Sequence, residues 1–161
     1  MTDTNRTGVA GNKVIQAVPG GTPFSQFYPA VLNCEWAKAE AMLAENVVWT
    51  MMPNNQILKD RNETMAFIKA SVSAAQREPA VMGDVFLKEW GVWEYWNIGT
   101  VTNDLVGFVR ASGWPLPNAG QGLAGKRYKV GICFVYHVNA SGHIDLVREY
   151  LDVGTVIAQL R

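Results

Sequence analysis

Val147-Arg148-Glu149-Tyr150-Leu151-Asp152 is the stretch that determines how the fold is interpreted, because it ends a long β-rich region. From residue 81 onward aromatic and β-branched residues predominate, and these residue types favour strands. We predict that the region forms a four-stranded antiparallel meander followed by a short helix. The predicted strands cover residues 86–96, 100–110, 126–138 and 143–150, and the helix covers 153–160.

The connections between these strands are predicted from turn-forming residues. Asn97-Ile98-Gly99 and Asn139-Ala140-Ser141-Gly142 have the composition of hairpin turns. Residues 111–125 are rich in glycine and proline and predict a long flexible loop. Long loops often cover a site, so this one is a candidate lid.

The first half of the chain shows mainly helical patterns. A helix is predicted to begin at Asn62 as its N-cap, with Glu63 in its first turn. Its buried stripe would consist of Met65, Ile68, Val72 and Ala75. Before it, the patterns predict helices over 24–33 and 35–45 and strands over 47–52 and 56–59. Helices followed by a meander favour the α+β class, with the helices packed into one concave face.

Length and composition limit the domain organisation and the partners. The 161 residues fit one domain over 23–161, preceded by an extended, partly flexible arm over 1–22. Fourteen basic and fourteen acidic residues cancel without clustering, so we expect no nucleic-acid partner. We expect no membrane partner and no export, because no apolar run reaches the length of a span and no leader pattern is present. Cys34 and Cys133 are widely separated, which favours free thiols and a cytoplasmic location.

Three motifs occur in a consistent order along the chain. They are Val48-Trp49-Thr50-Met51-Met52-Pro53, then Asp60-Arg61-Asn62 at a helix start, then Gly142-His143-Ile144 leading to Arg148-Glu149-Tyr150-Leu151-Asp152. In this order the chain resembles the NTF2-like superfamily, specifically its SnoaL-like and limonene-epoxide-hydrolase-like branches, over about residues 24–160. The resemblance implies a cone, in which a curved, mostly antiparallel sheet wraps around helices and encloses a central pocket.

The resemblance assigns a role to Glu149. In the family the last strand directs a carboxylate into the cavity, where burial would raise its pKa and suit acid/base chemistry near neutral pH. The alternative is a surface Glu149 paired with Arg148, because a one-residue slip in register turns every side chain to the other face. The fold itself hosts isomerases, dehydratases, cyclases, epoxide hydrolases, carriers and noncatalytic subunits.

Asp104 is the first candidate partner of Glu149. Epoxide-hydrolase-like members carry an Arg-x-Asp pair on the strand where Asp104 and Val106 would stand, and a Tyr and an Asn where Trp49 and Met51 stand. These departures argue against water activation. Two carboxyls in an apolar site would still separate into one proton donor and one acceptor, whereas the alternative places Asp104 in solvent at the rim.

Three further residues are candidates for polar roles. His137 could shuttle a proton, or could simply bond to backbone or solvent as a half-buried strand residue. Tyr28, in the first predicted helix, could polarise a substrate oxygen or could serve helix packing. Lys59 could reach the mouth of the cavity, although lysines at such positions are usually solvated. His137 and His143 lack further ligands in register, so no metal site is predicted.

Aromatic and methionine side chains predict the kind of ligand. Trp90 and Trp96 share one strand face and Trp93 the other, so one set would line the cone and the other its convex face. An apolar convex face would favour a homodimer or a higher homo-oligomer. The predicted substrate-binding residues are Trp49, Met51, Phe108, Trp114 and Lys59. They favour a small hydrophobic, flat aromatic or terpenoid-sized molecule.

The function expected from these features is a lyase or isomerase that needs no cofactor. It would act on a small hydrophobic, phenolic molecule by proton abstraction with elimination, dehydration or retro-aldol cleavage. Glu149 would be the main acid/base, Asp104 or His137 the second group, and Tyr28 an electrophile. The alternatives left open are epoxide hydrolysis of the limonene-epoxide type and a noncatalytic ligand-binding or partner subunit.

Overall fold

The computed structural model describes residues 20–161 and shows helices packed against one sheet. The predicted arm over 1–22 lies outside the described residues except for its last three. In chain order the elements are α1 (Pro23–Leu32), α2 (Trp36–Ala41), β1 (Leu43–Met51), β2 (Gln56–Leu58), α3 (Arg61–Ser73), β3 (Ala75–Arg77), β4 (Ala80–Leu87), β5 (Trp90–Val101), α4 (Leu105–Ser112), the 3-10 turn η1 (Pro117–Gly120), β6 (Arg127–Val138), β7 (Ile144–Leu151) and α5 (Val153–Leu160).

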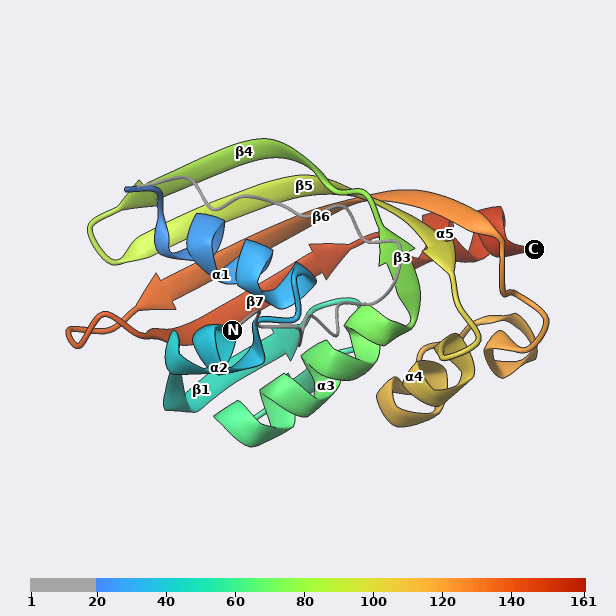
Figure 1. The fold of residues 1–161 in the computed structure, drawn as a ribbon, viewed down its shortest axis with the longest axis horizontal. Coiled ribbons are helices and arrows are strands. Elements are labelled where there is room, and N and C mark those ends of the chain that lie inside the picture. Colours follow the sequence, from blue (N-terminus) through green and yellow to red (C-terminus); the bar gives the residue numbers. More distant parts are fainter. Residues whose placement is uncertain (1–19) are drawn as a thin grey trace, which may run out of the picture.

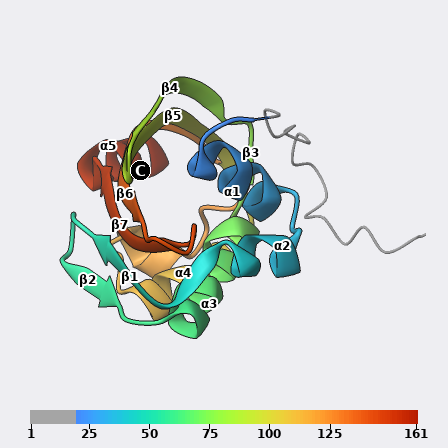
Figure 2. The ribbon, with the colours of Figure 1, turned by 90° about the vertical axis from the view of Figure 1, so that its left-hand side faces the viewer.

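The sheet is curved, with strand order β2-β1-β7-β6-β5-β3, and β4 also pairs with β5. Every pairing is antiparallel except that of β1 with β7. Helices α1, α2 and α3 lie against its concave side (Figures 1 and 2). Helix α5 packs beside the start of β6, where the side chain of Gln159 is hydrogen-bonded to the backbone of Lys129. The α+β class and the sheet wrapped around helices are therefore confirmed.

The predicted turn at Asn97-Ile98-Gly99 is wrong, because β5 continues through it. The strand pairs with β6 without a break from Trp90 opposite His137 to Thr100 opposite Arg127. The turn lies earlier, between β4 and β5, where Lys88 adopts a φ of 59°. The four-stranded meander is present, but it consists of β4, β5, β6 and β7.

The predicted strand over 100–110 is also wrong. After Val101 the chain turns and forms α4, whose N-cap position is occupied by Asp104. The helix ends at Gly113, which adopts the left-handed conformation with a φ of 67°, and glycine does so without steric cost. The predicted loop over 111–125 therefore contains the end of α4 and the turn η1.

The start of α3 differs from the prediction by two residues. Asp60, and not Asn62, is the N-cap, and its carboxylate accepts a hydrogen bond from the backbone N–H of Glu63 at 2.8 Å. The carboxylate of Glu63 in turn accepts from the backbone N–H of Lys59 at 2.7 Å. This reciprocal pair fixes the entry into the helix. At the other end Ala75, predicted in the helix stripe, begins β3.

The remaining elements agree well with the sequence patterns. Helix α2 is shorter than the predicted 35–45 helix because the chain enters β1 at Leu43. The turn over 139–142 is confirmed, since the side chain of Asn139 accepts from the backbone N–H groups of Ser141 and His143. Cys34 and Cys133 are free thiols, half-buried. No helix of residues 20–161 has the length and apolarity that crossing a bilayer requires.

An aromatic core fills the concave side of the sheet. Phe24 of α1 is fully buried, and its ring centroid lies 4.8 Å from that of Tyr136 and 4.9 Å from that of Phe134. Trp93 faces this core, whereas Trp96 is exposed on the convex side. The predicted separation of the meander tryptophans onto two faces is therefore confirmed.

Two glycines of β5 make room for tyrosines of β6. Gly91 is paired with Tyr136, and Gly99 is paired with Tyr128. A Cβ atom at either glycine would overlap the ring of the paired tyrosine. Both positions therefore require glycine because a neighbouring ring occupies the space.

Candidate functional site

An internal cavity of about 60 Å³ lies between the concave side of the sheet and helices α1 and α3. It is lined by Phe27, Tyr28, Val31, Trp49, Phe67, Ile68, Ser71, Val72, Arg77, Tyr95, Asn97, Ile132, Phe134 and Glu149. Among the aromatic rings of this set, Phe67 alone is partly exposed. Phe67 therefore marks the side from which a ligand could enter.

A larger groove of about 630 Å³ crosses the outer face beside Met82, Glu94, Cys133 and Tyr150. It is open to solvent along its length, so charges within it are screened by water. The inner cavity holds an arginine and a carboxyl group with a raised pKa in largely apolar surroundings, which is typical of a chemical site. We therefore take the inner cavity as the candidate site.

Glu149 reaches the cavity from β7 and is held by Trp49 of β1. The indole Nε1 donates to Oε2 of Glu149 at 3.0 Å. Burial raises the pKa of the Glu149 carboxyl from about 4.5 to about 6, although the Trp49 hydrogen bond and the charge of Arg77 both lower it. Glu149 is thus a base at neutral pH that can readily return the proton.

Arg77 brings a buried cation to the same cavity from β3. Only 8% of the residue is exposed, and its Nη2 donates to Oγ of Ser71 at 2.9 Å and to the Ser71 carbonyl oxygen. Strands β6 and β5 separate β3 from β7, so Arg77 and Glu149 enter the cavity from well-separated strands of the curved sheet. The site therefore has a proton acceptor and a permanent cation.

Two tyrosines complete the polar part of the cavity. Tyr28 of α1 and Tyr95 of β5 have ring centroids 4.6 Å apart. Burial raises the pKa of both phenols well above the ordinary value, and the charge of Arg77 opposes this only in part. Both phenols are therefore protonated at neutral pH and are hydrogen-bond donors.

Two of the predicted binding residues lie outside this cavity, at the α4 end of the molecule. Phe108 of α4 stacks edge-on against Trp114 with ring centroids 5.4 Å apart. Phe108 lines a second, smaller cavity of about 40 Å³ near α5, which borders the first at Ser71 and Arg77. Met51 is fully buried in the core and does not line the candidate site.

Asp104, His137 and Lys59 are not brought to the cavity. Asp104 is exposed at the start of α4, because the segment predicted as a strand is a turn and a helix. Its predicted pairing with Glu149 is therefore not formed. Lys59 is exposed in the loop before α3. Trp49, Tyr28 and Glu149 are the predicted site residues that the fold does bring together.

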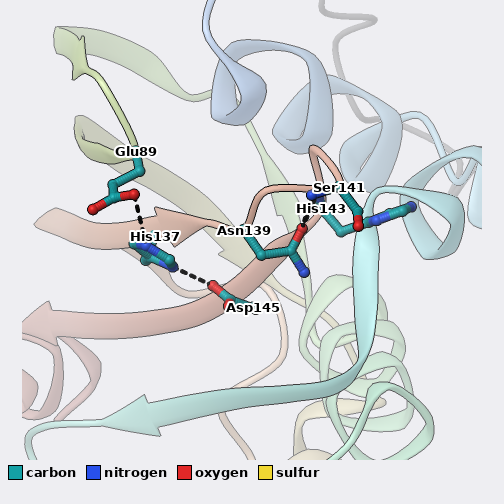
Figure 3. A network of polar contacts seen from close by, with 6 residues as sticks. All are labelled: Glu89, His137, Asn139, Ser141, His143 and Asp145. Carbon is teal, nitrogen blue, oxygen red and sulfur yellow. Dashed lines mark hydrogen bonds and ion pairs between the residues drawn. The ribbon is translucent and has the colours of Figure 1, made fainter.

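His137 belongs to a separate polar network on the convex face. Its Nδ1 lies 2.6 Å from Oδ1 of Asp145, and its Nε2 lies 3.8 Å from Oε2 of Glu89 (Figure 3). The indole of Trp90 packs beside the imidazole with ring centroids 4.8 Å apart. His137 thus cannot serve as the second proton-transfer group of the inner cavity.

Sequence reasoning missed Arg77 and Asn97 as site residues. The sequence predicts a turn at Asn97, because an Asn near a Gly is a common turn signal. Arg77 lies in a three-residue strand with no pattern of its own. A usable signal was present only for Asn97, since alternation from Trp93 and Tyr95 places Asn97 on the same face.

The described residues do not contain a metal-binding cluster. No group of three or more His, Cys, Asp or Glu side chains in residues 20–161 is arranged to hold an ion. The inner cavity itself has one carboxylate among its described lining residues, that of Glu149.

Comparison with known proteins identifies the fold as NTF2-like. A candidate polyketide cyclase from Xanthomonas campestris pv. campestris has a TM-score of 0.66 and 19% identity, with 86% of this chain and 94% of that chain covered. An NTF2-like protein of unknown function from Burkholderia pseudomallei gives 0.64 and 16%, covering 86% and 94%. An LEH-like epoxide hydrolase from M. tuberculosis gives 0.62 and 16%, covering 86% of each chain.

Sequence comparison gives no match to a family model and none to a curated protein. The structural likeness therefore establishes the fold, and function has to be argued from the cavity.

Proposed function

We propose that this protein is a cofactor-independent lyase or isomerase that abstracts a proton from a small hydrophobic, aromatic or phenolic molecule. The observation that carries the proposal is the half-buried Glu149 carboxyl, which has a raised pKa and lines a largely apolar cavity that also holds Arg77. NTF2-like neighbours described as a candidate cyclase and as having a ketosteroid-isomerase-like fold support chemistry of this kind.

Glu149 is the proposed base. In its ionised form it removes a proton from a carbon next to a carbonyl group, and the electron pair of the broken C–H bond moves onto the carbonyl oxygen. In a lyase this electron pair then returns to form a C=C bond, and the bond from the neighbouring carbon to a leaving group breaks. The leaving group takes the proton from Glu149. In an isomerase Glu149 returns the proton to a different carbon.

Arg77 and Tyr28 are the proposed stabilisers of the negative oxygen. Both are donors in a site with little water, where a fixed donor stabilises a developing charge far more than in bulk solvent. Arg77 is held by Ser71, so little reorganisation is needed when the charge forms. Arg77 is thus the proposed second group in place of Asp104 or His137, which the sequence predicts for that role. It acts through its charge and accepts no proton.

Epoxide hydrolysis is less well supported. Hydrolysis of that type holds a water between two carboxylates, and Glu149 is the single carboxylate among the described residues lining the cavity. One of its oxygens already accepts from Trp49. A cyclic epoxide incubated in labelled water with the protein is therefore expected to give no labelled diol.

Deuterium exchange tests the proposed chemistry directly, because it follows the proton-abstraction step itself. Small aryl ketones and phenolic carbonyl compounds are incubated with the protein in D₂O and followed by NMR for exchange of the C–H beside the carbonyl. Exchange should rise with pH through about 6, where the Glu149 base becomes ionised. Glu149→Gln should reduce it roughly 10²- to 10⁴-fold.

The matched control places the same substitution on the other side of the sheet. Glu94 is exposed on the outer face of β5 and lies outside the cavity. Glu94→Gln should leave exchange within about twofold of the wild type. Full exchange in Glu149→Gln would refute the proposal, and ligand binding without exchange at any pH would favour a noncatalytic carrier.

The protein is also proposed to form a homodimer through its convex face. Large apolar side chains are exposed there, including Leu87 at 72%, Trp90 at 43% and Tyr150 at 40%. An exposed apolar patch of this kind is typical of an interface. Sedimentation at several concentrations measures the association state.

A further inference from the structure

Asn97 carries a buried hydrogen-bond acceptor with no partner. The residue lies in the middle of β5, faces the cavity, and is only 6% exposed. Its Oδ1 makes no hydrogen bond with any of the described residues. A buried polar atom left in this state costs free energy, so such atoms in native proteins usually have a role.

The neighbouring polar groups of the cavity differ from Asn97 in this respect. Glu149 accepts from Trp49, and Ser71 accepts from Arg77. Neither phenol oxygen, of Tyr28 or of Tyr95, is a buried atom without a partner among the described residues. Asn97 thus holds a buried acceptor that these side chains leave unused, beside a cavity whose remaining surface is mostly aromatic and aliphatic.

We propose that Asn97 is a specificity-determining residue that accepts a hydrogen bond from an O–H or N–H group of the ligand. The ligand class is a single aromatic or similarly flat ring bearing a hydroxyl group. Its ring would contact Phe134 and Phe27, and its hydroxyl would reach Oδ1 of Asn97. The inference relies on the proposed function only for the location of the site, since it concerns binding and not turnover.

The free volume constrains how such a ring enters. About 60 Å³ is less than the roughly 150 Å³ of an engineered cavity that admits benzene in another protein. A ring therefore has to displace a side chain, and Phe67 at the edge of the cavity is the lining aromatic that is not fully packed. A hydroxyl that satisfies Asn97 would offset part of this cost, whereas a methyl group of similar size would not.

Phenol and toluene are the matched probes, because they differ mainly in the hydroxyl that replaces a methyl group. Binding is measured by titration with NMR detection of the wild type, Asn97→Leu and Glu149→Gln. The wild type should bind phenol about tenfold more tightly than toluene, the effect of one good hydrogen bond. Asn97→Leu, which is nearly isosteric, should lose this preference while still binding toluene.

Glu149→Gln separates this inference from the proposed function. It should lose deuterium exchange yet keep the phenol preference, because the acceptor at position 97 is unchanged. The inference is overturned if the wild type shows no preference, if the preference survives in Asn97→Leu, or if it disappears in Glu149→Gln.

A measurement on the wild type avoids dependence on the folding of any variant. The side-chain amide signals of Asn97 should shift when phenol is added and should move much less with toluene at equal occupancy. Equal shifts with both probes would overturn the inference.

Discussion

The two faces of the sheet carry two different polar groups of the kind used in proton transfer. On the inner face, Glu149 of β7 is held by the Trp49 indole in a cavity that also contains Arg77. On the outer face, His137 of β6 lies between Asp145 and Glu89, and 65% of the Glu89 side chain is exposed. His137 has more ionisable partners at short range, but Glu149 has the less hydrated surroundings.

The difference shows that partners alone do not make a reactive site. Exposed charge pairs are screened by water and contribute little, whereas burial penalises a charge and so shifts its pKa. The sequence predicts Glu149 as the main acid/base and His137 as a possible second proton-transfer group. They differ in the face of the sheet on which they lie, the inner face for Glu149 and the outer face for His137.

The largest difference between the faces should appear in stability. Trp93 faces the core and is 4% exposed, whereas Trp96 on the same strand is 38% exposed with the Lys129 ammonium over its ring. Trp93→Ala should lower the free energy of unfolding by about 3–5 kcal/mol, because it leaves a cavity. Trp96→Ala should cost about 1 kcal/mol or less.

Urea unfolding of both variants followed by circular dichroism provides the measurement. Equal losses would contradict the assignment of the two tryptophans to opposite faces. An unchanged dependence of unfolding on urea concentration is the control that both variants still unfold as the wild type does.

A medium effect is expected from the pH dependence of stability. Because the pKa of Glu149 is higher in the folded state, the folded protein holds its proton more tightly than the unfolded chain. Glu149 contributes about 2 kcal/mol to the free energy of unfolding below about pH 4.5. This contribution is lost as pH rises through about 6. Glu149→Gln should therefore be more stable than the wild type at pH 8, by up to about that amount.

Unfolding of the wild type and Glu149→Gln at pH 4.5, 6 and 8 measures this difference. The Gln carbonyl oxygen can still accept from Trp49, so the substitution mainly removes the charge. A variant that is less stable than the wild type at pH 8 would show that the carboxylate stabilises the fold and is not strained by burial.

The smallest effect is expected from the outer network. The pair formed by His137 and Asp145 is partly exposed, with 23% and 29% of the side chains accessible. Asp145→Asn should change the free energy of unfolding by less than about 1 kcal/mol and should leave deuterium exchange unchanged. A large loss of exchange would connect the outer network to the chemistry and would contradict the separation of the two faces.

The sequence was sufficient for the elements with strong patterns. The closing helix over 153–160, the strand that contains Glu149, and the first helix with Tyr28 all lie where they were predicted. These segments are bounded by turn signals and caps, such as Asp152 accepting from the backbone N–H of Thr155. Turn residues and helix caps close in sequence therefore determine where these elements begin and end.

The errors arose where tertiary pairing overrides local signals. Asn97 is a turn-former by composition, but its backbone is part of the long ladder between β5 and β6. The real turn uses Lys88, which gives no turn signal in the sequence. Because the turn was predicted too late in the chain, Asp104 fell within a predicted strand. The position of Arg77 was not predictable, because it depends on the pairing of β3 with β5, which is distant along the chain.

The paired glycines and tyrosines of β5 and β6 have a consequence for ligand size. The rings of Tyr136 and Tyr128 lie across Gly91 and Gly99, on either side of the segment of β5 that contributes Tyr95 and Asn97 to the cavity. Neither glycine can gain a side chain without moving a ring. Evolution or engineering that adapts this protein to a longer molecule would therefore have to change the helices, because the sheet sets the length of the chamber.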